Sequence, residues 1–238
     1  MSVGGFGSGS LGIITDGLVF YYDPYNSKSY TSGDTICYDL SKNQTSGYLS
    51  GNTFNGKGFV FDGVDDFIEV PNSSSIDSFT TGLTVNIMVE YTQIPSTNGN
   101  NYDSPTTKCT NSNWTDGFGF YWNNSNGGEF NFFINHYSNY RAYETVGTSI
   151  PLTNYCGVYN GSNVLLYKNG VLNNTGSALS ANVINSGLQM NIGCGSAAGH
   201  PYSNWFMEGI VYYIMIYDRP LTDDEILQNY NATKYRFR

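Results

Sequence analysis

Three aspartates stand close together in one short stretch of the chain, at Asp62, Asp65 and Asp66. Carboxylate oxygens are the ligands that calcium prefers, and Ca²⁺ takes about six to eight oxygens in all. A turn with three carboxylates supplies several of them, so the spacing predicts a calcium site if other loops add the rest. Aspartates also cap backbone N–H groups in ordinary turns, and the sequence leaves both interpretations open.

A second set of residues combines large aromatic rings with a place in or beside predicted loops. Sugars present apolar C–H faces that stack on such rings, while neighbouring amides and carboxylates hold the hydroxyl groups. Rings of this size are also the ordinary filling of a β-sheet core, and Trp205 is expected to have that role. The residues predicted to bind carbohydrate are Trp114, Trp122, Tyr137, Tyr140 and Tyr202.

Motifs for catalysis are weak. Residues 51–58 nearly spell a phosphate-binding P-loop, but Gly58 stands where Ser or Thr is needed, and an apolar strand pattern follows instead of a helix. Glycosidases need two carboxyl groups about 5–9 Å apart, and no strand motif here places two acids on one face. No GxSxG turn is present either. We expect no catalytic residues and no enzyme; hydrolysis by acids from distant segments is the minor alternative.

No cofactor other than calcium is expected. The cysteines are far apart in the sequence and form no CxxC pair, and the chain has only two histidines. A structural zinc site therefore has few ligands to use. The four thiols, which we expect to be buried or half-buried, are Cys37, Cys109, Cys156 and Cys194.

Charge and hydropathy exclude several classes of partner. The chain has 238 residues, a net charge of −9 and an isoelectric point near 4.4, and it has no basic stripe of the kind that nucleic-acid binding requires. No apolar run approaches the ~20 residues needed to span a bilayer, and the first residues have no secretory signal pattern. We expect a protein made in a cytoplasm, with no nucleic-acid partner and no membrane insertion.

The candidate calcium-binding and carbohydrate-binding residues must be positioned by β-strands, which the sequence marks as apolar segments with a period of two. Residues 83–92 alternate strictly between apolar and polar side chains, which predicts a strand with one buried face. Asn169-Gly170 between apolar runs predicts a tight hairpin, and residues 206–217, apolar on both faces, predict a central strand covered on both sides. The remaining apolar segments, which bring the total to about ten to thirteen strands, are 18–22, 59–61, 67–70, 117–122, 130–137, 164–167 and 188–192.

One short helix is expected near the C-terminus. Thr222 and Glu225 have the spacing of a capping box, and Ile226, Leu227 and Tyr230 form an apolar stripe. Residues 1–12 are rich in Gly and Ser and predict a flexible arm. No change of composition divides residues 13–238. The sequence thus predicts one all-β domain, a two-sheet antiparallel jelly-roll sandwich with one short C-terminal helix.

Several segments, taken in order, resemble the laminin-G-like, concanavalin-A-like lectin/glucanase domains. The resemblance covers about residues 13–235. It departs from the family at Tyr155-Cys156, where Trp-His is usual, and at Tyr212-Tyr213, where an acidic pair is usual. The segments that carry it are DGLVFYYD (16–23), YDLSKN (38–43), FVFDGVDDFI (59–68), GVYNG (157–161), LYKNG (166–170), FMEGI (206–210) and IYDRPLTDDEI (216–226).

The ending LQNYNATK (227–234) is similar to such domains in virion structural proteins of tailed bacteriophages, notably of marine and cyanobacterial hosts. This resemblance implies a non-enzymatic virion surface protein, on capsid or tail, that docks to other virion proteins and attaches to host surface glycans. Its expected location is the virion, and a homo-oligomer is left open. The alternatives are a free carbohydrate-binding lectin and a glycoside hydrolase.

Overall fold

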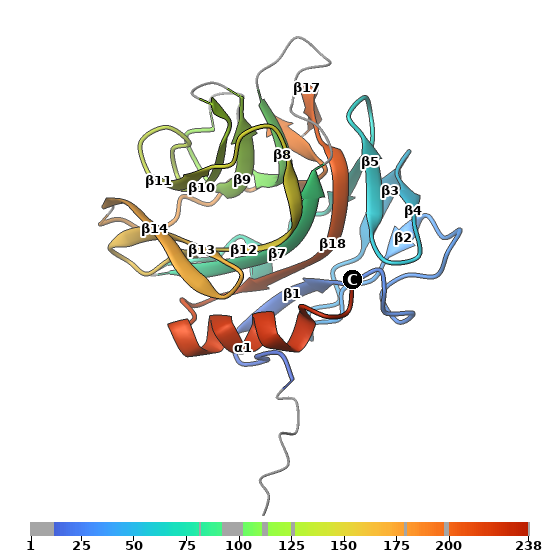
Figure 1. The fold of residues 1–238 in the computed structure, drawn as a ribbon, viewed down its shortest axis with the longest axis horizontal. Coiled ribbons are helices and arrows are strands. Elements are labelled where there is room, and N and C mark those ends of the chain that lie inside the picture. Colours follow the sequence, from blue (N-terminus) through green and yellow to red (C-terminus); the bar gives the residue numbers. More distant parts are fainter. Residues whose placement is uncertain are drawn as a thin grey trace, which may run out of the picture.

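The computed structural model describes residues 12–80, 82–91, 102–110, 114–124, 127–178, 180–197 and 200–237. The arm predicted for residues 1–12 lies outside this range apart from Gly12. The described chain forms two antiparallel sheets with a helix beside one of them (Figure 1). This confirms the predicted all-β sandwich with one C-terminal helix.

The first sheet, sheet A, has eight strands, and all of its pairs are antiparallel. In the order of pairing they are β14 (Val171–Ala178), β13 (Asn163–Lys168), β12 (Ile150–Tyr159), β7 (Leu83–Tyr91), β18 (Glu208–Tyr217), β5 (Phe59–Asp62) and β4 (Thr53–Phe54), and β1 (Leu18–Tyr22) pairs with β18 as well.

The second sheet, sheet B, also has eight antiparallel strands. Their order is β11 (Arg141–Thr145), β10 (Glu129–Ile134), β9 (Phe118–Asn123), β8 (Tyr102–Lys108), β15 (Met190–Ile192), β6 (Phe67–Val70), β3 (Gly47–Ser50) and β2 (Ile36–Cys37). The remaining elements are a hairpin of β16 (Cys194–Ala197) and β17 (His200–Phe206), a 3₁₀ turn η1 (Ser74–Ile76) and the helix α1 (Asp223–Thr233).

The main core lies between the two sheets. Strand β7 contributes every second residue to it, from Leu83 to Tyr91. The other face of β7 is also buried, because α1 and the C-terminal tail cover the outer face of sheet A; Met88 there belongs to a second cluster with Ile226 and Phe237. The prediction of a single buried face for this strand was therefore incomplete.

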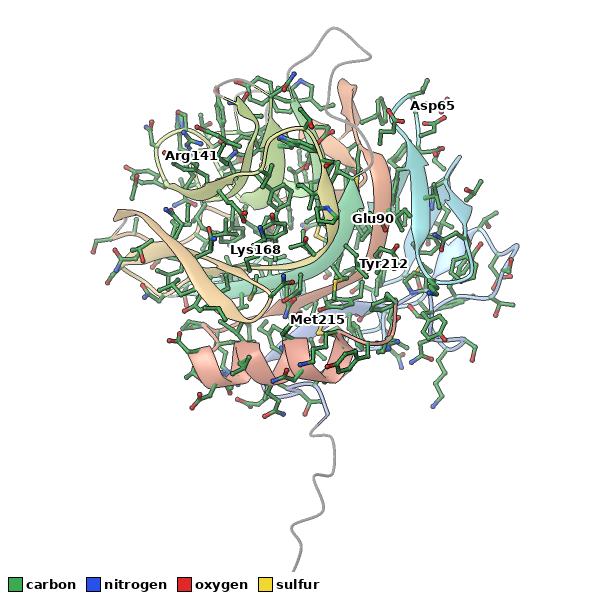
Figure 2. The ribbon with its side chains drawn as sticks, viewed as in Figure 1. Asp65, Glu90, Arg141, Lys168, Tyr212 and Met215 are labelled. Carbon is green, nitrogen blue, oxygen red and sulfur yellow. The ribbon has the colours of Figure 1, made fainter. Side chains whose placement is uncertain are left out.

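Strand β18 is central, as predicted from its apolar residues on both faces. It pairs with β7, β5 and β1. Ile214 and Ile216 face the main core, whereas Tyr213 and Met215 face the layer that contains α1. Figure 2 shows Met215 directly beside this helix.

The helix begins with the predicted capping box. Thr222 Oγ1 accepts the backbone N–H of Glu225 at 3.3 Å, and Glu225 Oε2 accepts that of Thr222 at 2.9 Å. Arg219 donates to both oxygens of Glu225, at 2.9 and 2.7 Å. These hydrogen bonds from Arg219 lower the pKa of Glu225 to about 2.

Two local predictions differ in their outcome. Asn169 and Gly170 have φ of 52° and 82°, so the hairpin between β13 and β14 is confirmed. The strand expected over residues 130–137 ends earlier, at Ile134. Asn135 is left-handed there, with φ of 58°, and its side chain is bound to the backbone at residues 182 and 184.

The described residues form eighteen strands, more than expected. The additions are mainly short edge strands such as β2 and β4, two residues each. Residues 51–58 form β4 and the turn to β5, and no helix follows them. The segment that resembles a P-loop is therefore half of a hairpin. Among the described residues no helix is long and apolar enough to cross a membrane.

Candidate functional site

The outer face of sheet B, remote from α1, carries a third group of aromatic residues, which we call the aromatic cluster. Its buried members are Trp114, Tyr121 and Phe133, and Tyr102, Tyr137 and Trp205 pack around them half-buried. The alternation of side chains along β9 and β10 produces the cluster, because Phe120, Trp122 and Phe132 point into the main core while their neighbours point outward.

Hydrogen bonds fix the rings of this cluster. Trp114 Nε1 donates to the carbonyl of Ser196 at 2.9 Å, which ties the ring to hairpin β16–β17. The hydroxyl of Tyr121 donates to the carbonyl of Tyr137 at 2.9 Å. Trp114 stacks on Phe133 with ring centroids 5.4 Å apart. The cluster is therefore a rigid support, and its half-buried rings form the exposed rim.

Polar residues continue this face on strands β10 and β11, and we call them the polar platform. It consists of Glu129, Asn131, Arg141 and Tyr143, which alternate with inward residues. Arg141 Nη1 donates to Glu129 Oε2 at 2.6 Å and also to Asn131 Oδ1. The guanidinium lies 4.6 Å from the centre of the Tyr143 ring, and Tyr143 is an exposed residue. Figure 2 places Arg141 on the side of the molecule away from α1.

The platform and the aromatic cluster are electrostatic neighbours. The pKa of Tyr102 is raised, first by burial and then by Tyr137, while Arg141 lowers it and Glu129 raises it. Burial lowers the pKa of Arg141, but its hydrogen bond to Glu129 and the nearby charges outweigh this effect, so the pKa is raised overall. One surface thus combines half-buried aromatic rings with the guanidinium of Arg141, which hydrogen bonds hold in place, the carboxylate of Glu129 and the amide of Asn131.

The residues predicted to bind sugar are divided by the structure. Trp114 and Tyr137 come together in the aromatic cluster, with ring centroids 6.3 Å apart, but Trp114 is only 1% exposed. Trp122 is fully buried in the main core against Tyr91, and Tyr140 packs against the same core. For Trp114 and Trp122 the prediction of rings available in loops was wrong, because both point into packed interiors. The Tyr202 side chain lies outside the described residues.

The three aspartates of the predicted calcium site do lie together. Asp62, Asp65 and Asp66 each place one oxygen within 4.8 Å of the others. Asp66 Oδ2 accepts the backbone N–H of Asp62 at 3.0 Å, and Asp62 Oδ1 accepts that of Val64 at 2.8 Å. Burial, followed by the neighbouring carboxylates, raises the pKa of Asp66 to about 6. Three carboxylates fit a hard cation as part of a ligand set, and two of them already cap the turn.

The aspartates and the platform are separate sites. Asp65 and Arg141 are at opposite sides of the molecule in Figure 2. Sequence reasoning missed the platform residues because each looks like an ordinary polar strand residue. The available signal was the alternation over 129–134, in which Glu129, Asn131 and Phe133 share the face opposite Phe130, Phe132 and Ile134.

Comparisons with known proteins bear on the family. The family described as "Concanavalin A-like lectin/glucanases superfamily" matches residues 62–227, well over half of the chain. The chain belongs to this superfamily. The expected laminin-G-like, concanavalin-A-like fold is thereby confirmed, while the bacteriophage origin is not tested by this match. The comparison with curated protein sequences gave no match.

Solved structures with the same fold include enzymes and binding domains. A Trypanosoma rangeli sialidase bound to the inhibitor DANA matches with a TM-score of 0.66 and 13% identity, over 95% of this chain and 34% of the sialidase. The receptor-binding domain of botulinum neurotoxin mosaic serotype C/D matches with a TM-score of 0.67 and 14% identity, over 92% of this chain and 52% of that one. The chain thus spans about a third and about half of these relatives.

The expectation that the protein is not an enzyme must be corrected. Sialidases are among its structural neighbours, at 11–13% identity. Likeness at that level establishes the shared fold alone, and a receptor-binding domain shares it equally. A superfamily of lectins and glucanases contains both kinds of protein, so the weak catalytic motifs do not exclude catalysis.

Proposed function

We propose that the protein is a glycan-recognition domain that binds carbohydrate on the outer face of sheet B. The observation that carries the proposal is the polar platform beside the rim of the aromatic cluster. Tyr137, Tyr102 and Trp205 offer half-buried rings there, and Arg141 on the neighbouring platform, which acts electrostatically on Tyr102, is a donor. Rings for apolar sugar faces and fixed polar groups for hydroxyls are the two requirements of such a site.

The platform retains hydrogen-bonding capacity for a ligand. A guanidinium has five N–H donors, and the hydrogen bonds to Glu129 and Asn131 both use Nη1 of Arg141. The donors on Nε and Nη2 have no partner among the described residues. Because Glu129 and Asn131 hold the group in place, a ligand would bind to it without first ordering a flexible side chain.

A glycan array with purified protein tests the proposal. Tyr143→Ala and Tyr137→Ala should each weaken glycan binding about tenfold, a loss typical of a removed aromatic contact. Tyr235→Ala is the matched control, because Tyr235 is 68% exposed and lies just after α1, away from sheet B. Binding that is unchanged in both test variants, or no binding to any glycan, contradicts the proposal.

We further propose that this domain is carried on a virion of a tailed bacteriophage, on capsid or tail, and attaches it to host surface glycans. The support is the similarity of residues 227–234 to phage structural domains. In this chain they lie on α1 and its C-cap, where Asn229 and Thr233 are buried. Mass spectrometry of purified particles tests the proposal: the protein should co-purify with virions, and its absence from them contradicts it.

A further inference from the structure

A second, separate groove lies at the opposite end of sheet B, near β2. Its volume is about 460 Å³, and it is lined by Lys28, Tyr38, Asp39, Gln44 and Ser46. This volume is within the range of about 300–1,000 Å³ that small-molecule sites have. In Figure 1, β2 and β11 are on opposite sides of the molecule, so the groove is far from the polar platform.

The floor of the groove is rigid. Asp39 is 6% exposed, and its carboxylate accepts four hydrogen bonds, from the backbone N–H groups of Tyr21, Ser41 and Thr45 and from the hydroxyl of Ser41, at 2.8–3.1 Å. These bonds hold residues 39–45 against β1. Since they also offset the negative charge of Asp39, this carboxylate is a structural anchor rather than a free acceptor.

The walls of the groove, in contrast, end in groups without partners. The ammonium of Lys28, the hydroxyl of Tyr38, the amide of Gln44 and the hydroxyl of Ser46 make no side-chain hydrogen bond with the residues that the structure describes. Tyr38 is 48% exposed. One open aromatic face is therefore surrounded by donors and acceptors, and Lys28 carries the only charge of the lining that no described residue compensates.

The backbone at Gln44, whose side chain lines the groove, has a strained conformation. Its φ is 55°, in the left-handed region that glycine adopts at lower cost. A glycine there would relieve the strain, but it would remove the amide from the groove. The observed residue thus gives the groove a polar side chain at a position where the backbone favours glycine.

We propose that this groove binds an anionic pyranose unit, with the sugar ring on Tyr38 and its negative group on Lys28. Gln44 and Ser46 bind the remaining hydroxyls. The proposal rests on the proposed function in taking carbohydrate as the ligand class, but it uses different residues on a different part of the surface. A compact ammonium attracts a carboxylate or a sulfate alike, so uronate and sulfated sugars share the required chemistry.

Calorimetry with oligosaccharides tests the inference on the full chain. Alginate and carrageenan fragments supply the carboxylate and the sulfate, and dextran is the neutral probe. We expect one or both anionic probes to bind, dextran to bind at least about tenfold more weakly, and binding to weaken between about 50 and 500 mM NaCl. Equal binding of dextran, or no binding of either anionic probe, overturns the inference.

Matched variants locate the binding. Tyr38→Ala, Lys28→Ala and Gln44→Gly should each weaken anionic binding by at least about fivefold, as expected for the loss of one stacking or charge-assisted contact. Gln44→Gly should do so without lowering the melting temperature, because it relieves strain. Tyr48→Ala and Lys42→Ala are the controls: both residues are exposed, and neither lines the groove.

The two proposals fail separately. If Tyr143→Ala abolishes binding of the anionic probes and Tyr38→Ala does not, glycans bind at the platform and the groove inference is wrong. If Tyr38→Ala, Lys28→Ala and Gln44→Gly weaken binding of the anionic probes while Tyr143→Ala and Tyr137→Ala change neither that binding nor binding on the glycan array, the groove is the site and the platform proposal fails. Wild-type affinity in all three groove variants overturns the inference whatever the platform does.

Discussion

Lys108 Nζ lies 3.0 Å from Asp77 Oδ1 in the interior of the protein, where the Lys108 side chain is 1% exposed. The ammonium also donates to Asn72 Oδ1 at 2.9 Å and to Ser186 Oγ at 3.0 Å. Asp77 accepts in turn the backbone N–H groups of Ser186 and Gly187, at 3.1 and 2.9 Å. The pair therefore fastens β8 and the segment before β15 to the residue that follows η1.

Breaking this pair should cost much of the stability of the fold. Asp77→Asn leaves a buried ammonium without its counter-charge, and such losses typically cost about 3–5 kcal/mol in the free energy of unfolding. Urea denaturation measures it. Asp16→Asn is the control, because Asp16 pairs with Arg219 at 2.9 Å but its side chain is 87% exposed; an exposed pair contributes less than about 1 kcal/mol. Equal losses in the two variants would contradict the prediction.

Asp103, unlike Asp77, is a buried carboxylate with no cation paired to it among the described residues. It is 2% exposed, and within the described residues neither oxygen has a hydrogen-bond partner of regular geometry. Burial raises the pKa of Asp103 well above its usual range; the neighbouring Tyr91 hydroxyl lowers it and the charge of Glu208 raises it. The folded state thus binds a proton more tightly than the unfolded state does.

The sign of the pH effect follows from linkage. Because the folded pKa of Asp103 is raised, its contribution to the free energy of unfolding falls as the pH rises above the unfolded value of about 3.9. Asp103→Asn should therefore raise the free energy of unfolding at pH 7 by at least about 1 kcal/mol and flatten its decline between about pH 4 and 7. Asp116→Asn is the control, because Asp116 accepts the Thr110 backbone N–H at 2.8 Å, and it should destabilise.

The capping box at α1 gives a third test. Thr222→Ala removes the acceptor for the Glu225 backbone N–H and should lower the free energy of unfolding by about 1 kcal/mol. Thr222→Ser keeps the hydroxyl and should retain most of the stability. The low pKa of Glu225, about 2, predicts that its contribution is present above the usual pKa near 4.5 and is lost as the pH falls toward 2. Thermal melts of both variants at neutral and acid pH measure it.

Patterns of local origin explain why so much of the fold was predictable. The Asn169-Gly170 turn, the Thr222–Glu225 cap and the strand from Leu83 to Tyr91 each depend on a few adjacent residues, and the structure confirms all three, although that strand is buried on both faces. The short edge strands β2 and β4 could not be predicted, since pairing with β3 and β5 defines them and their own residues do not.

The sites were harder to predict because they depend on contacts between distant segments. Trp114 and Trp122 are only eight residues apart in the sequence, yet one supports the outer face of sheet B and the other fills the core. Which ring faces out depends on the register of β9 with β10 and on the hairpin β16–β17 that covers Trp114. Tyr38 and Gln44 likewise line one groove because hydrogen bonds to Asp39 hold their loop against β1.

The calcium site at Asp62, Asp65 and Asp66 stays a prediction, and one residue separates its two interpretations. Asp62 and Asp66 cap backbone N–H groups of the turn, whereas the Asp65 carboxylate is exposed and makes no hydrogen bond with the described residues. If calcium binds, excess Ca²⁺ should raise the melting temperature in proportion to RT ln(1 + [L]/Kd), and Asp65→Asn should abolish the rise while leaving the metal-free melt unchanged. Differential scanning calorimetry with Ca²⁺ and with a chelator measures both. Identical melts of the wild type in the two conditions would leave the aspartates as turn caps alone.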